Sequence, residues 1–318
     1  MTLDDILEKI KQADTIAIMA HETPDGDAIG SCLAMNAALK KLGKTPDVII
    51  REVPKVFDFM PGRDEIKKDT NVEKYDLAIS LDCADLKRVD GSEYFENAKE
   101  TIVIDHHGTN TMFGDINFVN PASPACCQIL IGMFQYFNIE IEKELGACIL
   151  TGIITDTGGF KYAGVTPETF EFTAELLEKG VNVSKIYKKV MDTKTKAYFE
   201  LMKKITNRME FLYDGKIAFT YLNNEDMKEA NAEPGDHEGL VNIGRDIEGV
   251  EVSIFIRQKE DEENTYKISM RSNEYVNVSD ICMTFGGGGH ERAAGASIEG
   301  TVEEIKEKIV KETAKSLK

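Results

Sequence analysis

Short apolar runs alternate with longer amphipathic stretches over the first half of the chain. The strand-like runs lie at residues 15–20, 46–51, 76–81 and 101–105. The helix-like stretches lie at residues 27–42, 123–137 and 142–154. The run Thr101–Ile104 has no polar alternation, which is typical of a strand covered on both faces. The alternation predicts an α/β domain in which helices flank a parallel sheet.

The second half follows a different pattern. Helical spacing continues at 166–179 and 183–211, and strand-like runs follow at 216–222, 250–258 and 265–271. A last amphipathic stretch, at 301–315, predicts a closing helix. We therefore predict a smaller α+β domain at 209–318, joined to a first domain at 1–184 by a lysine-rich helical connection at 185–208.

Charge and cysteine content limit the class of protein. The 318 residues include 56 acidic and 38 basic ones, giving a formal net charge of −18, which argues against binding long nucleic acid through many phosphates. The six cysteines show no C-x-x-C spacing, so we interpret them as reduced thiols. We find neither a signal peptide nor a membrane span, and we expect a cytoplasmic protein without a membrane partner.

Histidine and aspartate gather where the predicted strands end. His21, Asp25 and Asp27 follow the first run, and Asp82 and Asp85 follow the third. The fourth run, at 101–105, leads into the sequence Asp105-His106-His107. Because the carboxyl ends of parallel strands share one edge of the sheet, these side chains are expected to converge on one polynuclear metal site.

The ligand types favour manganese. Carboxylates suit hard divalent cations such as Mn²⁺ and Mg²⁺, while imidazole shifts the preference towards Mn²⁺, Fe²⁺, Co²⁺ or Zn²⁺. Asp156, in the sequence Thr155-Asp156-Thr157-Gly158-Gly159, is a further candidate ligand. A pair of ions needs a shared oxygen, and Asp82 is our choice for this bridge. The alternative for a single residue such as Asp25 is a helix cap.

The second domain offers groups that suit phosphate. Gly286–Gly289 removes four β-carbons, so amides of Gly287, Gly288 and Gly289 can approach an anion, and His290 can add a hydrogen bond. A flexible linker is the alternative reading of this run. Arg271 and Arg88 are candidate phosphate contacts or else surface charges. His237 has no role in this interpretation.

These motifs together resemble those of the DHH phosphoesterases. The resemblance rests on the sequence from His21 to Asp27, Asp82, Asp105-His106-His107, Asp156 and the run from Gly286 to His290. Chain length and the glycine run are similar to the stand-alone nano-RNase and pAp-phosphatase members. The resemblance implies one Mn²⁺ held by His21, Asp25 and Asp82. It implies a second Mn²⁺ held by Asp27, Asp82, His106 and Asp156.

The resemblance also implies a reaction. The protein would hydrolyse short oligoribonucleotides to mononucleotides, or 3′-phosphoadenosine 5′-phosphate (pAp) to AMP, in a cleft between its domains, with Mg²⁺ or Co²⁺ as substitutes for Mn²⁺. His107 would contact the scissile phosphate, and Asp105 would orient a histidine or serve only as a strand-end acceptor. Leaving-group protonation by His107 or by a metal-bound water is a hypothesis. A homodimer is compatible with this reading.

Several other functions stay open. A cyclic-di-AMP or pApA phosphodiesterase uses the same parts, whereas an inorganic pyrophosphatase has a serine-arginine-lysine signature that we do not find. A RecJ exonuclease would need added domains. A non-catalytic nucleotide-binding regulatory module is a further alternative, although none of the expected ligands is missing. A zinc hydrolase of another type is disfavoured because H-E-x-x-H and cysteine clusters are absent from the sequence.

Overall fold

The computed structural model of the chain describes residues 2–162, 164–233, 235–260, 262 and 264–318. The chain divides into two compact units, Met1–Thr193 and Lys194–Lys318. The division falls inside the range 185–208, which the sequence predicts as the connection between domains. Each unit is described by itself below.

The first unit is built on a six-stranded sheet in which every neighbouring pair is parallel, with the strand order β3-β2-β1-β4-β5-β6. Its strands are β1 Ile16–Met19, β2 Asp47–Ile49, β3 Ile66–Lys67, β4 Leu77–Leu81, β5 Glu100–Asp105 and β6 Ile116–Val119. β4 is buried along its whole length, as its uninterrupted apolar sequence requires. The carboxyl ends of β1, β4 and β5 therefore lie side by side.

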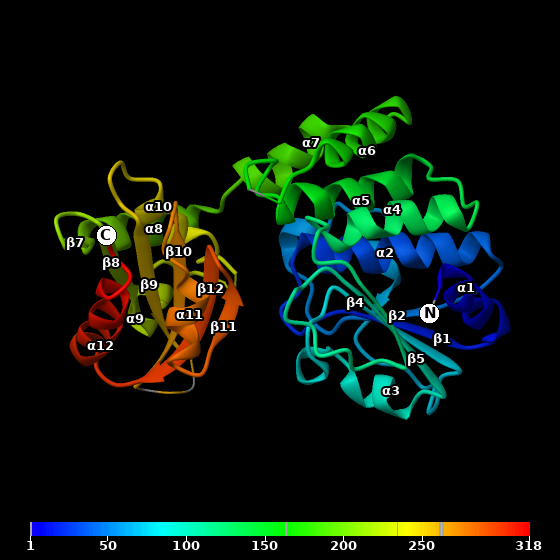
Figure 1. The fold of residues 1–318 in the computed structure, drawn as a ribbon, viewed down its shortest axis with the longest axis horizontal. Helices are drawn as coiled ribbons and strands as arrows, with labels where there is room; N and C mark the ends of the chain where they lie inside the picture. Colours follow the sequence, from blue (N-terminus) through cyan, green and yellow to red (C-terminus); the bar gives the residue numbers. More distant parts are fainter. Residues whose placement is uncertain (1, 163, 234, 261, 263) are drawn as a thin grey trace. The chain divides into compact units, whose positions relative to one another are not determined.

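Helices cover both faces of this sheet (Figure 1). The helices of the first unit are α1 Leu3–Gln12, α2 Gly26–Lys41, α3 Ser92–Asn97, α4 Cys126–Tyr136, α5 Lys143–Asp156, α6 Pro167–Glu178 and α7 Val183–Tyr187. Among them, α6 and α7 pack on α5, outside the layer that faces the sheet. Short 3₁₀ turns lie at Lys55–Phe57, Arg63–Glu65 and Leu86–Arg88, and a π-helical turn follows α7 at Lys188–Asp192. α2 packs against both α4 and α5 and shares with them the larger apolar core on one side of the sheet. Phe95 of α3 belongs to the smaller core on the other side.

The second unit contains a mixed sheet with the strand order β11-β12-β10-β9-β8-β7. Its strands are β7 Glu210–Leu212, β8 Ile217–Leu222, β9 Val252–Gln258, β10 Thr265–Ser272, β11 Gly288–His290 and β12 Ala293–Glu299. Only β8 and β9 pair in parallel among these described strands. Parallel pairing requires a crossover, and residues 223–251 provide it.

Two apolar cores lie against this second sheet. One contains residues of α8 Lys196–Asn207 and α10 Leu240–Arg245, and α9 Asn224–Glu229 packs beside it. The other contains residues of α11 Val278–Met283 and α12 Val302–Ala314. The predicted fold class, a parallel α/β domain followed by an α+β domain, is confirmed. Within the described part of the chain no helix is long and apolar enough to cross a membrane.

Two predictions about individual elements were wrong. The range 183–211 was predicted as helix, but the helical structure is interrupted at residues 193–195, and Glu210–Leu212 forms strand β7. Thr195 caps α8 by accepting a hydrogen bond from the amide of Tyr198, which starts a new helix at that point. β10, which carries Arg271, was predicted to be the last strand, but β11 and β12 follow it and β12 pairs with it.

Candidate metal centre

Asp82 follows β4 directly and lies at the centre of the predicted ligands. Its backbone has a positive φ of 54°, a conformation that few residues other than glycine adopt. The amide of Asp82 donates to the carbonyl of Ile104 in β5 over 3.0 Å, which fixes this turn at the sheet edge. The side chain is only 2 % exposed. Strain of this kind is concentrated at functional sites.

His21 and Asp25 approach Asp82 from the loop after β1. The ligand atoms of these three side chains lie within 4.8 Å of one another, and Nε2 of His21 is 3.8 Å from Oδ2 of Asp82. Asp25 is also the N-cap of α2, because its Oδ1 accepts hydrogen bonds from the amides of Asp27 and Ala28. Cap and ligand are therefore compatible roles for one carboxylate. α2 begins at Gly26, one residue before the start that the sequence predicts.

Asp27 is fully buried and is held by the start of α4. Its Oδ2 accepts a hydrogen bond from the amide of Cys126 over 2.6 Å, and its Oδ1 accepts one from the amide of Cys127 over 2.9 Å. The N-cap of α4 is Ala125, which provides no side-chain cap, so the carboxylate of Asp27 takes that role. A β-carbon on Gly152 of α5 would lie 2.5 Å from Oδ1 of Asp27. Only glycine fits there without moving the carboxylate.

His106 joins Asp27 and Asp156 in a second group whose ligand atoms lie within 4.8 Å. Its Nε2 is 3.3 Å from Oδ2 of Asp156 and 3.4 Å from Oδ1 of Asp82. Its Nδ1 lies 3.2 Å from the carbonyl of Ser123, to which it can only donate. This contact selects the tautomer in which Nε2 carries the lone pair and can serve as the metal-ligating atom.

Asp105 is fully buried beneath the two histidines. Its Oδ1 accepts the amide hydrogen bond of His106 and lies 2.7 Å from Nδ1 of His107, and its Oδ2 accepts from the side-chain amide of Asn110. Burial alone would lower the pKa of His107, but the contact with Asp105 and the charge of Asp82 raise it. The geometry suits the predicted role of Asp105 in orienting a histidine.

The charged groups of the centre favour the binding of a cation. Burial together with the charge of Asp82 raises the pKa of Asp27, and burial with the charge of Asp27 raises the pKa of Asp156. The ion-pair partners of Asp82 are all histidines. Nδ1 of His21 and Oδ1 of Asp82 are buried without a hydrogen-bond partner. Crowded carboxylates, imidazoles and unused lone pairs fit a divalent ion well.

The other predicted site residues occupy three further places. Arg88 is exposed on the 3₁₀ turn Leu86–Arg88, and its carbonyl accepts a hydrogen bond from the amide of Glu22 in the metal loop. Arg271 lies on β10 and His290 on β11, both in the second unit. Gly287 ends the turn after α11, where a β-carbon would lie 2.1 Å from the carbonyl of Gly295. The glycine run is thus packed structure in this unit rather than a flexible linker.

The sequence interpretation missed the groups that position the ligands. The amides of Cys126 and Cys127, the carbonyl of Ser123 and the side chain of Asn110 all contact predicted site residues. Backbone groups leave no trace in residue identity. The one available signal was alanine at the N-cap of a buried helix, which indicates that an acceptor from elsewhere closes it.

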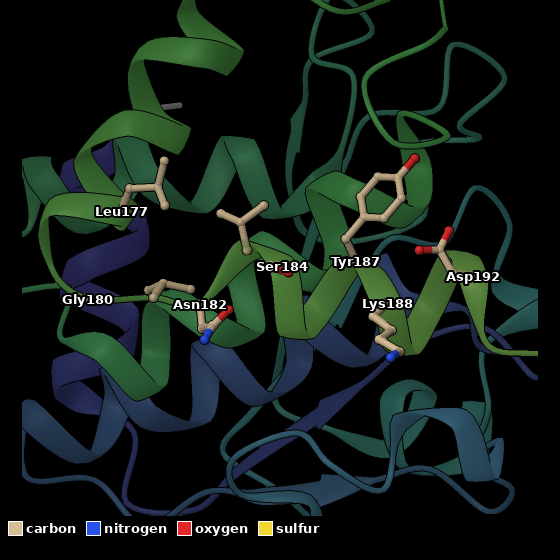
Figure 2. A pocket seen from close by; sticks show the side chains of 9 residues that line it. Leu177, Gly180, Asn182, Ser184, Tyr187, Lys188 and Asp192 are labelled. Atoms are coloured by element: carbon tan, nitrogen blue, oxygen red, sulfur yellow. The ribbon is translucent and has the colours of Figure 1, made fainter.

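A separate pocket of about 690 Å³ lies in the first unit along α6, α7 and the π-helical turn (Figure 2). It is lined by Leu177, Gly180, Val181, Asn182, Val183, Ser184, Tyr187, Lys188 and Asp192. The lining contains none of the predicted site residues and no histidine. This pocket is therefore not part of the metal centre.

Comparison with known proteins agrees with the resemblance seen in the sequence. The model of the DHH family, N-terminal domain matches residues 15–153, and that of the DHHA1 domain matches residues 214–318. The bifunctional oligoribonuclease and PAP phosphatase NrnA of Thermus thermophilus is 36 % identical over 290 residues, covering 90 % of this chain and 84 % of that protein. The chain belongs to the DHH family.

Two solved structures are similar in fold to this chain. An exopolyphosphatase-related protein from Bacteroides fragilis is 32 % identical and superposes with a TM-score of 0.89, covering 98 % of this chain and 95 % of that one. Exonuclease RecJ bound to manganese gives a TM-score of 0.54 at 13 % identity, covering 98 % of this chain and 93 % of that one, and shows a shared fold. The predicted family and its class of hydrolases are confirmed by these relatives.

Proposed function

We propose that this DHH protein hydrolyses phosphoric esters of short oligoribonucleotides and of pAp with the help of two divalent cations. The observation that carries the proposal is the position of Asp82, whose carboxylate lies among both predicted ligand groups. A shared carboxylate is what a pair of ions requires. The name of the relative from Thermus thermophilus supports the choice of substrates.

The predicted ligand sets correspond to two of the three groups of neighbouring ligand atoms, with Asp82 added to the group of Asp27, His106 and Asp156. His21, Asp25 and Asp82 would hold one ion. The other would be held by Asp27, Asp82, His106 and Asp156. Bound ions of this kind lower the pKa of water and stabilise charge on phosphoryl oxygens. Because the donors are carboxylates and imidazoles without a thiolate, we expect Mn²⁺, with Mg²⁺ or Co²⁺ as weaker substitutes.

The role of His107 follows from its contacts. Asp105 holds Nδ1 of His107, so Nε2 is the nitrogen that can face a substrate. When its ring is protonated, His107 can donate from Nε2 to an oxygen of the scissile phosphate or to the leaving group. The carboxylate of Asp105 stabilises this protonated form and fixes the orientation of the ring.

Substrate binding is assigned to the second unit as well as to Arg88. The guanidinium of Arg271, the amides of Gly287, Gly288 and Gly289 and the ring of His290 would bind phosphate or nucleotide groups. Binding energy from these remote groups would hold the reacting phosphorus in place. We further propose that the protein works in the cytoplasm, and a homodimer is compatible with this function.

A substrate panel tests the proposal. Purified protein with Mn²⁺ would be offered pAp, pApA, two- to five-nucleotide RNA, cyclic di-AMP, long single-stranded DNA, pyrophosphate and tripolyphosphate. We expect turnover of pAp and of the short RNAs, and little turnover of long DNA. Rapid cleavage of pyrophosphate or tripolyphosphate with inert dinucleotides would overturn the proposal in favour of a polyphosphate hydrolase. Cleavage of cyclic di-AMP above all others would favour the phosphodiesterase alternative.

A further inference from the structure

Met112, in the loop between β5 and β6, has a backbone conformation that a bulky residue rarely adopts. Its φ is +54°, in the left-handed region. Its side chain is 56 % exposed and belongs to none of the apolar cores that the described residues form. The fold therefore holds a large apolar side chain in water, on a strained backbone, although no core packing offsets the strain.

Other described residues besides glycine that have a positive φ have a structural reason for it. These are Asp82, Asn138, Phe160, Tyr213, Asp214 and Asn231. The two asparagines follow the ends of α4 and α9, where asparagine commonly takes this conformation. The pair Tyr213-Asp214 lies in the tight turn between β7 and β8. The ring of Phe160 packs against the larger core, and Asp82 is a predicted ligand. The strain at Met112 has no such explanation.

Contacts on both sides of Met112 fix its backbone. Oδ1 of Asn110 accepts a hydrogen bond from the amide of Met112 over 2.7 Å. Nδ2 of the same asparagine donates to Oδ2 of the buried Asp105 over 2.7 Å. On the other side, the ring of Phe113 packs in the smaller core, with its centroid 5.3 Å from that of Phe95. The loop is therefore anchored before and after the strained residue.

The same loop is joined to the turn that carries the central carboxylate of the metal centre. The carbonyl of Cys83 accepts a hydrogen bond from the side chain of Asn110 over 3.1 Å. The carbonyl of Ala84 accepts one from the amide of Thr111 over 2.9 Å. Both acceptors lie within two residues of Asp82 along the chain. The strained methionine is thus presented at the edge of the sheet where the ligands gather.

A nucleobase is the part of the proposed substrates that suits this side chain. The thioether of methionine makes favourable contacts with aromatic rings at a distance of about 5 Å. Contact with the flat face of a base also removes apolar surface of the methionine from water. Phosphate and ribose are polar and offer neither effect. Strained residues are concentrated at sites that bind ligands, which fits a role of this kind.

We propose that Met112 contacts the base of the nucleoside that carries the scissile phosphate. The inference rests on the proposed function and adds to it a residue that distinguishes nucleotides from other phosphate esters. The metal centre acts on the phosphate, whereas the side chain of Met112 covers one face of the base. Met112 therefore determines the affinity for a substrate that has a base and leaves the reaction at phosphorus unchanged.

The experiment compares a substrate that has a base with one that lacks it. Steady-state release of phosphate with Mn²⁺ is measured for pAp and for methyl riboside 3,5-bisphosphate, in which a methoxy group replaces adenine. Met112→Gly removes the side chain and relieves the backbone, and Met112→Gln keeps the length but adds a polar amide. Asn138→Gly is the matched control, because Asn138 is exposed, has a φ of +55° and follows the end of α4 away from Asp27.

We expect both Met112 variants to raise KM for pAp about fivefold with little change in kcat, since the contact with the base is the same before and during the reaction. KM for methyl riboside 3,5-bisphosphate should be alike in all four proteins. Asn138→Gly should match the wild type with both substrates. The urea midpoint of Met112→Gly should be no lower than that of Asn138→Gly, because glycine adopts a positive φ without strain.

Three results would overturn the contact with the base. The first is a wild-type KM for pAp in both Met112 variants. The second is an equal rise of KM for the two substrates, which would mean that the loop shapes the metal centre. The third is a lower urea midpoint for Met112→Gly than for Asn138→Gly, which would assign the side chain to folding. Failure of the proposed function is distinct, because the wild-type chain would then turn over neither pAp nor short RNA, and the base contact would fall with it.

Discussion

Buried carboxylates are neutralised differently in the two units. In the second unit, Asp226 is 2 % exposed and accepts a hydrogen bond from Nη2 of Arg208 over 2.8 Å, with Nζ of Lys204 3.3 Å from its Oδ1. In the first unit, Asp82 is equally buried, but its ion-pair partners are histidines. The side chains of Asp27 and Asp156 crowd the same place.

The difference indicates that Asp226 and Asp82 have different roles. Asp226 has its countercharges within the fold, so its role is complete when the chain is folded. The centre around Asp82 concentrates negative charge beyond what neighbouring imidazoles offset, which costs stability until a cation arrives. Incomplete neutralisation of this kind is a mark of a functional site, and it can be tested against Asp226 as the internal reference.

The largest effect is expected from Asp82→Ala. Because this carboxylate would be the shared ligand of the two ions, its loss should reduce turnover by about three orders of magnitude or more and lower the number of Mn²⁺ bound. Steady-state kinetics and metal analysis of the dialysed protein measure the two effects. Asp85→Ala is the control, since Asp85 caps the turn Leu86–Arg88 and belongs to neither ligand group. Unchanged turnover in Asp82→Ala would remove the bridging assignment.

The second largest effect, a loss of Mn²⁺ affinity, is expected from Gly152→Ala. The added methyl group would meet the carboxylate of Asp27 at 2.5 Å and Sγ of Cys127 at 2.4 Å, so Asp27 has to move. We expect Mn²⁺ affinity to fall by about 10- to 100-fold, as when a group that orients a ligand is lost. Titration calorimetry gives the affinity. Gly132→Ala in α4 is the matched control, because its β-carbon meets no atom within 4 Å; equal affinities in both variants would contradict the role of Gly152.

Adding metal should stabilise the first unit alone. At a free Mn²⁺ concentration of 100 times the dissociation constant, a single site adds about 2.7 kcal/mol to the free energy of unfolding. Hydrogen exchange should slow in α2, α4 and α5, and amides around Asp226 should exchange as before. The same titration of Asp82→Ala serves as the reference. Equal protection of both units by Mn²⁺ would show that the metal does not bind where we place it.

The smallest effect is expected at Asp226, the reference carboxylate of the second unit. Asp226→Asn should lower the free energy of unfolding by about 2 kcal/mol at pH 7, because it breaks a buried pair whose cations are partly solvated. Although burial opposes it, the hydrogen bond from Arg208 lowers the pKa of Asp226 from 3.8. In the wild type, the stabilisation from the charged carboxylate of Asp226 is therefore fully present above pH 3.8. It disappears as the pH falls through the lower pKa of the folded state.

Urea unfolding of the wild type and Asp226→Asn at pH 7 and at pH 3 measures this difference. Glu229→Gln removes an exposed partner of Lys204 and should cost about 0.5 kcal/mol or less. A difference for Asp226→Asn that stays constant with pH would mean that its charge is not what stabilises this site.

The sequence predicts which His and Asp side chains gather at one edge of the sheet, because strand ends are easy to recognise. His21, Asp82 and Asp105 each follow an apolar run, and parallel pairing of β1, β4 and β5 brings these ends together. The prediction failed where the secondary structure changes but the spacing of hydrophobic residues does not. The amphipathic spacing continues through residues 193–195, although the chain starts a new helix there. β11 and β12 escaped notice because Gly288, Gly289 and the alanines of β12 have little strand preference.

The fine geometry of the centre was also out of reach. Asp27 is fixed by the amides of Cys126 and Cys127, about a hundred residues away along the chain. The ring of His106 is fixed by the carbonyl of Ser123. Any residue type offers these backbone groups, so only the folded chain shows which of them are used.

The crossover between β8 and β9 has a consequence for how this protein can diversify. The hydrogen-bonding ladder of the two strands depends on their own backbones, but the connecting residues also include Asp226, whose ion pair with Arg208 ties α9 to the end of α8. Changes of length between homologues are therefore expected in the segment between α9 and α10, where they leave both the sheet and this ion pair untouched.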